Sequence, residues 1–138
     1  MEAIVPYLNF NGNAAEALAF YSKALNGTIV SQQTFADAPM PSSEAMKDKI
    51  LHAVFQSGAL TIMVSDCPPE FTSTPGTNVS LSLNFPDVES IDKTFTALSE
   101  GGQVTMELQD TFWGARFGMI IDKFGINWMF NHDKKEGK

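Results

Sequence analysis

Hydrophobic and polar positions alternate over several short segments and recur at helical spacing over two longer ones, which predicts strands and two helices. We expect Asn13 to cap the first helix together with Glu16, and Asn26-Gly27 to end it. We expect Asp87 to cap the second helix, which runs to Glu100. Alternation predicts eight strands: Ile4–Phe10, Thr28–Phe35, Ile50–Gln56, Leu60–Ser65, Asn78–Phe85, Gln103–Leu108, Ala115–Ile121 and Ile126–Asn131.

Glycine and proline mark the connections between these elements. Ser57-Gly58 and Lys123-Phe124-Gly125 predict two hairpin turns. The Ala36–Lys47 segment predicts a loop with one helical turn, and the three prolines of Cys67–Thr77 indicate a linker. The charged tail His132–Lys138 is expected to fray.

The chain repeats itself at an offset of 75 residues. Leu8-Asn9-Phe10 recurs as Leu83-Asn84-Phe85, Phe20 as Phe95, and Gly27 as Gly102, at equivalent points of two matching patterns. The repeat predicts two modules, about 1–66 and 78–131, within a single domain spanning 1–138. Each has the order βαβββ, so the fold class is α+β, with a curved, mostly antiparallel sheet covered on one side by its helix. The two uncovered faces are expected to enclose a cavity.

Composition narrows the possible functions. The 138 residues are 43% hydrophobic and 18% charged, as in a folded domain. A single cysteine, Cys67, excludes an internal disulfide, and we interpret this thiol as a bystander. The net charge of −7 argues against nucleic-acid binding. No apolar run reaches the roughly 18 residues of a membrane span, and no signal peptide is apparent, so we expect a cytoplasmic protein without membrane partners.

Two stretches, YLNFNGNAAEALAFY and LQDTFWGARFGMIIDKFGINWMFN, resemble the PhnB-like family of the vicinal oxygen chelate (glyoxalase/bleomycin resistance) superfamily. The resemblance covers residues 4–131, and Asp110–Arg116 is its most specific part. It implies a paired βαβββ fold, a small-molecule ligand and a homodimer. The family is also labelled a 3-demethylubiquinone-9 3-methyltransferase domain. A methyl-donor site would need a Gly-rich turn after the first strand of a parallel sheet, whereas this chain has Asn11-Gly12-Asn13.

The resemblance also implies where a catalytic metal would be held. The superfamily's His and Glu ligand positions fall on Val5, Ser80, about Met129, and the Val64–Asp66 stretch. Valine and methionine cannot supply the imidazole or carboxylate donors that a catalytic divalent metal requires. We therefore predict no superfamily-type metal and no cofactor.

Strand alternation predicts which side chains face away from the helices. This set is rich in hydroxyls and amides, which are costly to bury unpaired, and so it indicates a hydrated pocket for a small polar or amphipathic ligand. The inward set is Val5, Tyr7, Asn9, His52, Val54, Gln56, Thr61, Met63, Ser65, Ser80, Ser82, Asn84, Asn127, Met129 and Asn131.

Other candidates each have a structural alternative. His52 is either a hydrogen-bonded strand residue or a general acid/base. Trp113 and Phe112 either pack structurally or stack on a ligand. Arg116 either pairs with Asp110 or Glu107, or binds an anionic ligand group. The candidate ligand-binding residues are Tyr7, Asn9, His52, Met63, Ser80, Ser82, Asn84, Trp113, Arg116 and Met129.

Two functions follow from this set. The first is metal-free binding of a small molecule. The second is a metal-independent enzyme that uses His52 as acid/base and Arg116 as an anion anchor. A third interpretation, a dimerisation module, does not account for the polar inward faces.

Overall fold

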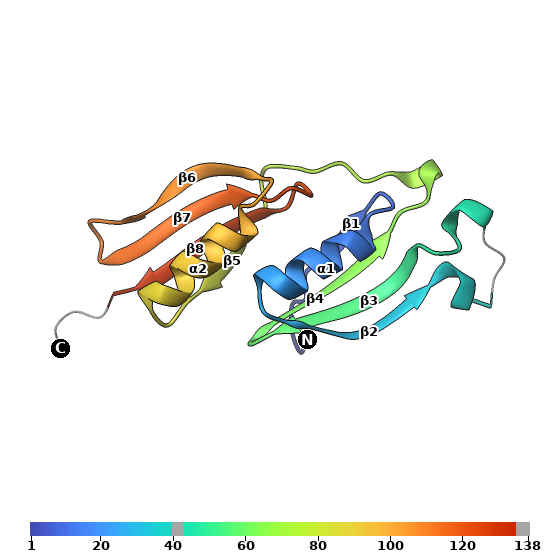
Figure 1. The fold of residues 1–138 in the computed structure, drawn as a ribbon, viewed down its shortest axis with the longest axis horizontal. Coiled ribbons are helices and arrows are strands. Elements are labelled where there is room, and N and C mark those ends of the chain that lie inside the picture. The colour runs from blue at the N-terminus through green and yellow to red at the C-terminus, as the bar shows by residue number, and fades with distance from the viewer. Residues whose placement is uncertain (40–42, 135–138) are drawn as a thin grey trace. The chain divides into compact units, whose positions relative to one another are not determined.

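The computed structural model describes residues 1–39 and 43–134. It divides into two compact units, Met1–Thr74 and Pro75–Lys138, and the boundary falls within the predicted linker (Figure 1). The first unit contains these elements: β1 (Tyr7–Phe10), α1 (Ala14–Ala24), β2 (Thr28–Thr34), β3 (Ile50–Ser57) and β4 (Leu60–Asp66), with 3-10 turns at Phe35–Asp37, Glu44–Met46 and Pro69–Phe71. The second contains β5 (Leu81–Asn84), α2 (Val88–Leu98), β6 (Gln103–Asp110), β7 (Ala115–Ile121) and β8 (Asn127–Asp133).

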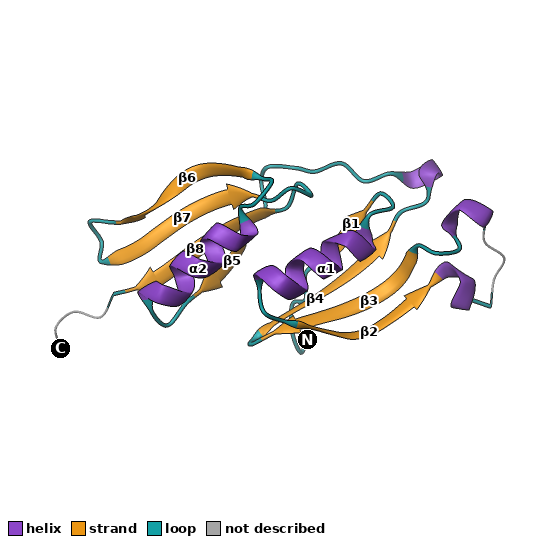
Figure 2. Ribbon diagram, in the orientation of Figure 1, coloured by secondary structure: helices purple, strands orange, loops and turns teal. Residues whose placement is uncertain are grey.

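The two units repeat one sheet topology. Their strand orders are β1-β4-β3-β2 and β5-β8-β7-β6. In each, the first strand pairs in parallel with the last, and the other pairings are antiparallel. The fold class is α+β, as predicted: two four-stranded mixed sheets, each with one α-helix. Figure 2 shows each helix lying over the strands of its own unit.

Each unit has its own core between helix and sheet. In the first, alternate strand residues pack against α1, and Ala53, Phe55, Ile62 and Val64 are fully buried together with Ala17 and Tyr21 of the helix. In the second, Phe95 of α2 meets Phe130 of β8 edge-on, with ring centroids 5.0 Å apart. Trp128 and Ile91 are fully buried in this second core as well. In β1, β3, β4 and β8, most residues that alternation places opposite the inward set are buried. Leu51 and Leu60, which alternation also places on the helix side, are only half-buried.

Several predicted boundaries are wrong by a few residues. The first strand begins at Tyr7 rather than Ile4, because Pro6 has no N–H to donate to the ladder, although its carbonyl still accepts from the Met63 N–H. The fifth strand begins at Leu81 rather than Asn78, because the side-chain amide of Asn127 donates hydrogen bonds to the Gly76 and Val79 carbonyl oxygens. The second helix ends at Leu98, two residues before Glu100.

The ends of other strands also shift. β2 stops at Thr34 because the Asp37 carboxylate accepts from the Thr34 N–H and turns the chain into a 3-10 helix. β6 extends to Asp110 instead of Leu108, and β8 extends to Asp133. The expectation that the tail frays from His132 onward is wrong for His132 and Asp133, which belong to β8. Residues 135–138 of that tail and residues 40–42 of the predicted loop lie outside the described residues.

The cap predicted for the first helix is wrong, because a distant carboxylate takes its place. Asn13 makes no side-chain capping bond. Instead Asp66, only 2% exposed at the end of β4, accepts from the Gly12 and Ala14 N–H groups at 2.9 Å. Its second oxygen accepts from the Ile50 N–H, also at 2.9 Å. One carboxylate therefore joins the helix start to two strands. The cap of the second helix, Asp87, is confirmed, since its Oδ1 accepts from the Ser90 N–H at 2.7 Å.

The repeated glycines Gly27 and Gly102 have a shared physical cause. The residues before them, Asn26 and Gly101, adopt positive φ of 53° and 75° and end the helices. A Cβ on Gly27 would collide with the Phe55 ring, and one on Gly102 would collide with the Ile121 carbonyl. Glycine is thus required for close approach to the following strand.

Among the residues described, no helix is long and apolar enough to cross a membrane.

Candidate functional site: the uncovered sheet faces

The face of the first sheet opposite α1 carries the predicted polar residues. Cross-strand partners share a face, and the register aligns Tyr7 with Met63, Met63 with Val54, and His52 with Gln33. The alternation places Asn9, Ser65, Gln56 and Thr61 on this same side. Tyr7 is 44% exposed, whereas its neighbour Leu8 on the helix side is 8% exposed. We call this surface the open face of the first unit.

Tyr7 and His52 are joined on this open face. The Tyr7 hydroxyl lies 3.0 Å from Nδ1 of His52, and the two ring centroids are 5.7 Å apart. The residues come from β1 and β3, which are separated in the sheet by β4. The bond spans 45 positions of sequence, and no local motif indicates it. Sequence reasoning placed both residues on one face but did not predict their contact.

This open face carries no full charge. Among the β1–β4 residues that the structure describes on this side, none is Asp, Glu, Lys or Arg. The only carboxylate of the four strands, Asp66, belongs to the opposite, buried side. The surface offers amide, hydroxyl, imidazole and thioether groups, which suit an uncharged polar or amphipathic molecule better than a polyanion.

The corresponding open face of the second unit is more apolar at its centre. One cross-strand row runs from Ser82 through Met129 and Met119 to Met106. The next row carries Asn84 and Asn131, whose side chains are hydrogen-bonded at 3.1 Å. Methionine side chains are flexible and polarizable, and adapt to ligands of varied shape. Sequence reasoning missed Met106 and Met119, although the alternation of residues 115–121 already indicates that Met119 faces away from the helix.

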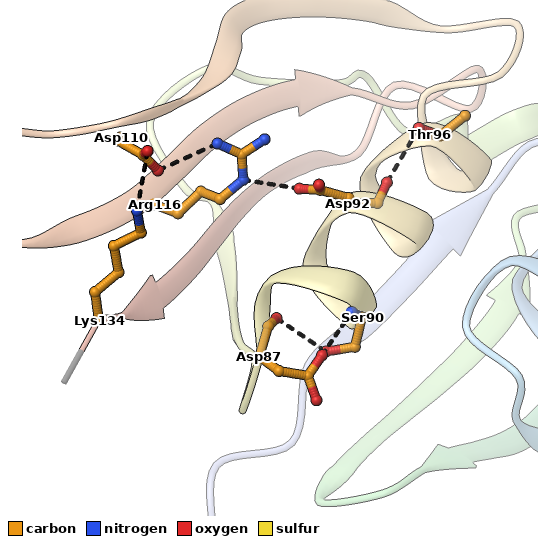
Figure 3. Close-up of polar contacts among 7 residues, drawn as sticks. All are labelled: Asp87, Ser90, Asp92, Thr96, Asp110, Arg116 and Lys134. Carbon is orange, nitrogen blue, oxygen red and sulfur yellow. Dashed lines mark hydrogen bonds and ion pairs between the residues drawn. The ribbon is translucent and has the colours of Figure 1, made fainter.

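Arg116 lies on the other side of that sheet, and its partners are protein side chains (Figure 3). Its Nε donates to Asp92 of α2 at 2.8 Å, and another guanidinium nitrogen donates to Asp110 at 3.2 Å. Lys134 binds the second Asp110 oxygen at 2.9 Å. The predicted pairing of Arg116 with Asp110 is therefore confirmed, and Asp92 is a partner that the sequence did not reveal. The structure does not bring Arg116 together with Ser82, Asn84 or Met129.

The electrostatic consequences are local. The hydrogen bond to Asp92 raises the pKa of Arg116, and Asp110 adds to this effect. Lys134, followed by Arg116, lowers the pKa of Asp110. The pKa of Asp87 is lowered chiefly by the hydrogen bond from the Ser90 backbone. All three groups stay ionised near neutral pH and hold α2 and the strand ends together.

The remaining candidates lie in connections. Phe112 and Trp113 are 96% and 60% exposed on the β6–β7 turn, and their rings meet edge-on at 5.1 Å. Trp113 also contacts Phe117, whose side chain is on the open face of the second unit. Ser80 precedes β5 and is half-buried. Cys67 follows β4, and its N–H donates to the Phe10 carbonyl.

The residues at the superfamily's metal positions do not fit a metal. Val5 and Met129 offer no imidazole or carboxylate, and Asp66 is engaged by three backbone N–H groups on the buried side. Across residues 1–39 and 43–134, no three His, Cys, Asp or Glu side chains are grouped to hold a metal ion.

The family model of the Glyoxalase/Bleomycin resistance protein/Dioxygenase superfamily matches residues 3–130. The chain belongs to this superfamily. Protein YjdN of Escherichia coli K12 is 30% identical over 141 residues, covering 95% of each chain. Among solved structures, protein PA1353 from Pseudomonas aeruginosa is 41% identical with a TM-score of 0.87, and the alignment covers 98% of this chain and 100% of that one.

The expected PhnB resemblance is found among the solved structures as well. A PhnB protein from Bacillus cereus is 29% identical, with a TM-score of 0.76 and coverage of 95% of this chain and 99% of that chain. That protein carries a provisional label of 3-demethylubiquinone-9 3-methyltransferase. In the present superfamily member, both sheets are mixed and neither is the doubly wound parallel sheet of the dinucleotide-type fold.

Proposed function

We propose that this glyoxalase-superfamily member binds a small, uncharged polar or amphipathic molecule on the open face of its first unit, without the superfamily metal. The observation that carries the proposal is the Tyr7–His52 hydrogen bond on a helix-free surface whose described strands carry no Asp, Glu, Lys or Arg on that side. Asn9 and Met63 flank the pair and would contact the same ligand.

Native mass spectrometry of gently purified protein, compared with a denatured run, tests this function. A non-covalent organic mass on the native protein supports it, and the native mass also reports whether two copies associate, as the superfamily relationship suggests. A stoichiometric divalent metal would refute the metal-free site.

Variants locate the site. His52→Ala should lose the retained mass, whereas Gln32→Ala should keep it. Gln32 is the matched control because it is exposed and pairs with Ala53, so it points to the opposite side of the same sheet. Equal retention by both variants would place the ligand elsewhere and contradict the proposal.

A metal-independent enzyme is the second candidate function. It is favoured by the same hydrogen bond, which orients the His52 imidazole as acid/base chemistry requires. Once a ligand is known, the two functions separate: His52→Ala would abolish turnover by an enzyme while leaving some binding. A pure binding protein would show no turnover in either form.

A further inference from the structure

The orientation of the Tyr7–His52 bond specifies what the open face offers to a ligand. A phenolic hydroxyl is a good donor, and the unprotonated nitrogen of a neutral imidazole is a good acceptor. If instead Nδ1 carried the proton, it would donate to a phenol oxygen, a weaker acceptor, and the phenol hydrogen would need another partner. Over residues 1–39 and 43–134, the Tyr7 hydroxyl has the His52 nitrogen as its hydrogen-bond partner.

We infer that Tyr7 holds His52 in the tautomer protonated at Nε2, so that the site presents an N–H donor to a carbonyl oxygen of a neutral ligand. This inference rests on the proposed function and names its ligand class. Within the part of the chain that the structure describes, Tyr7 is the hydrogen-bond partner of the His52 ring, which leaves Nε2 for a partner from outside. Tyr7 is a positioning residue, because it acts through His52.

A carbonyl is favoured over a charged oxygen acceptor by the surroundings of His52. No Lys or Arg on the open face of the first unit stabilises an anion, as far as the described strands go. The whole chain also has a net charge of −7, which opposes anionic ligands at long range.

The second histidine provides an internal reference. Nδ1 of His132 lies 2.9 Å from the Phe85 carbonyl oxygen. A carbonyl only accepts, so His132 must carry its proton at Nδ1. The two histidines of this chain are therefore expected in opposite tautomers.

Long-range nitrogen–proton NMR correlation of the uniformly labelled full chain reads the tautomers directly. It is recorded at about pH 8.5, above the ordinary histidine titration range near 6.5. Two opposite patterns are expected, with the His52 signals identified by their loss in His52→Gln. Tyr7→Phe should turn the His52 pattern into a mixture while His132 is unchanged. If His52 shares the Nδ1–H pattern of His132, the inference is wrong, whatever the protein binds.

Binding is tested with two neutral single-ring probes, acetophenone as a carbonyl acceptor and aniline chiefly as a donor. Acetophenone should perturb the NMR signals of His52 Nε2 and of the backbone amides of β1, β3 and β4. Aniline should perturb the same signals less. Tyr7→Phe should lower the affinity for acetophenone about threefold to tenfold, which corresponds to the loss of one hydrogen bond. His52→Gln, whose amide nitrogen stands near the Nε2 position, should retain more affinity than His52→Asn.

The outcomes separate the two proposals. Equal binding of both probes on these strands, unaffected by Tyr7→Phe, would leave the binding function standing and overturn the carbonyl inference. No perturbation of these strands by either probe would overturn both. Gln32→Ala serves again as the control that changes the sheet but not its open face.

Discussion

Asp66 makes the strongest test of how the first unit is held together. Its carboxylate is 2% exposed and accepts three backbone N–H bonds, each 2.9 Å long. Asp66→Ala removes the only acceptor in these bonds for Gly12, Ala14 and Ile50. A hydrogen bond to a charged group contributes about 1.5–3 kcal/mol, and water entering the space recovers part of the loss. We expect a fall of about 3–5 kcal/mol in the free energy of unfolding.

Urea unfolding followed by far-UV circular dichroism measures this loss, and amide hydrogen exchange at the three N–H groups shows whether protection is lost there first. Asp66→Asn keeps one carbonyl oxygen as acceptor, so it should lose less, about 1–3 kcal/mol. Asp48→Ala, on an exposed carboxylate of the same unit, should stay within about 0.5 kcal/mol of wild type. If Asp66→Ala matches Asp48→Ala, the three hydrogen bonds do not stabilise the fold as argued.

Three further expectations follow from contacts in the second unit and the linker. Gly102→Ala should lower the free energy of unfolding, measured by heat or urea, by about 2–4 kcal/mol, because its Cβ would collide with the Ile121 carbonyl oxygen. Gly76→Ala is the control and should leave this free energy nearly unchanged, because its Cβ would make only an ordinary contact. Arg116→Gln should cost only about 1 kcal/mol, as for other largely solvent-screened ion pairs, and should leave acetophenone binding unchanged; a selective loss of binding would return this residue to the site. The pKa of Asp87 in the folded protein is lowered, so the contribution of this carboxylate to stability is fully present above its ordinary pKa of 3.8 and is lost as the pH falls through the folded pKa. The difference in unfolding free energy between wild type and Asp87→Asn should therefore be constant near neutral pH and shrink in acid.

Sequence reasoning predicted the fold well because both of its signals are local or periodic. The alternation of polar and apolar residues identified the helix side of β1, β3 and β4, and the repeated Leu-Asn-Phe segments identified two equivalent modules. The predicted strand boundaries were wrong where side chains form hydrogen bonds with backbone groups that the sheet would otherwise use, as the Asn127 amide does with the carbonyls before β5.

The candidate site was predicted only as a set of side chains on one face. Alternation places Tyr7 and His52 on that face, but their hydrogen bond depends on strand order and register, which bring β1 within reach of β3 across β4. The cap from Asp66 and the pairing of Arg116 with Asp92 were missed for the same reason. Each joins elements distant in sequence, and no spacing rule encodes such a contact.

The parallel pairing of β1 with β4 also affects how the first unit folds during its synthesis on the ribosome. β1 emerges early but has no partner until β4 is synthesised, and the final residue of β4, Asp66, is the one that anchors the start of α1. The sheet and the helix cap of the first unit therefore cannot be complete before β4 has left the exit tunnel. All strands and the helix of the first unit lie within Met1–Thr74, so every pairing inside its sheet can be made while the second unit is still being translated.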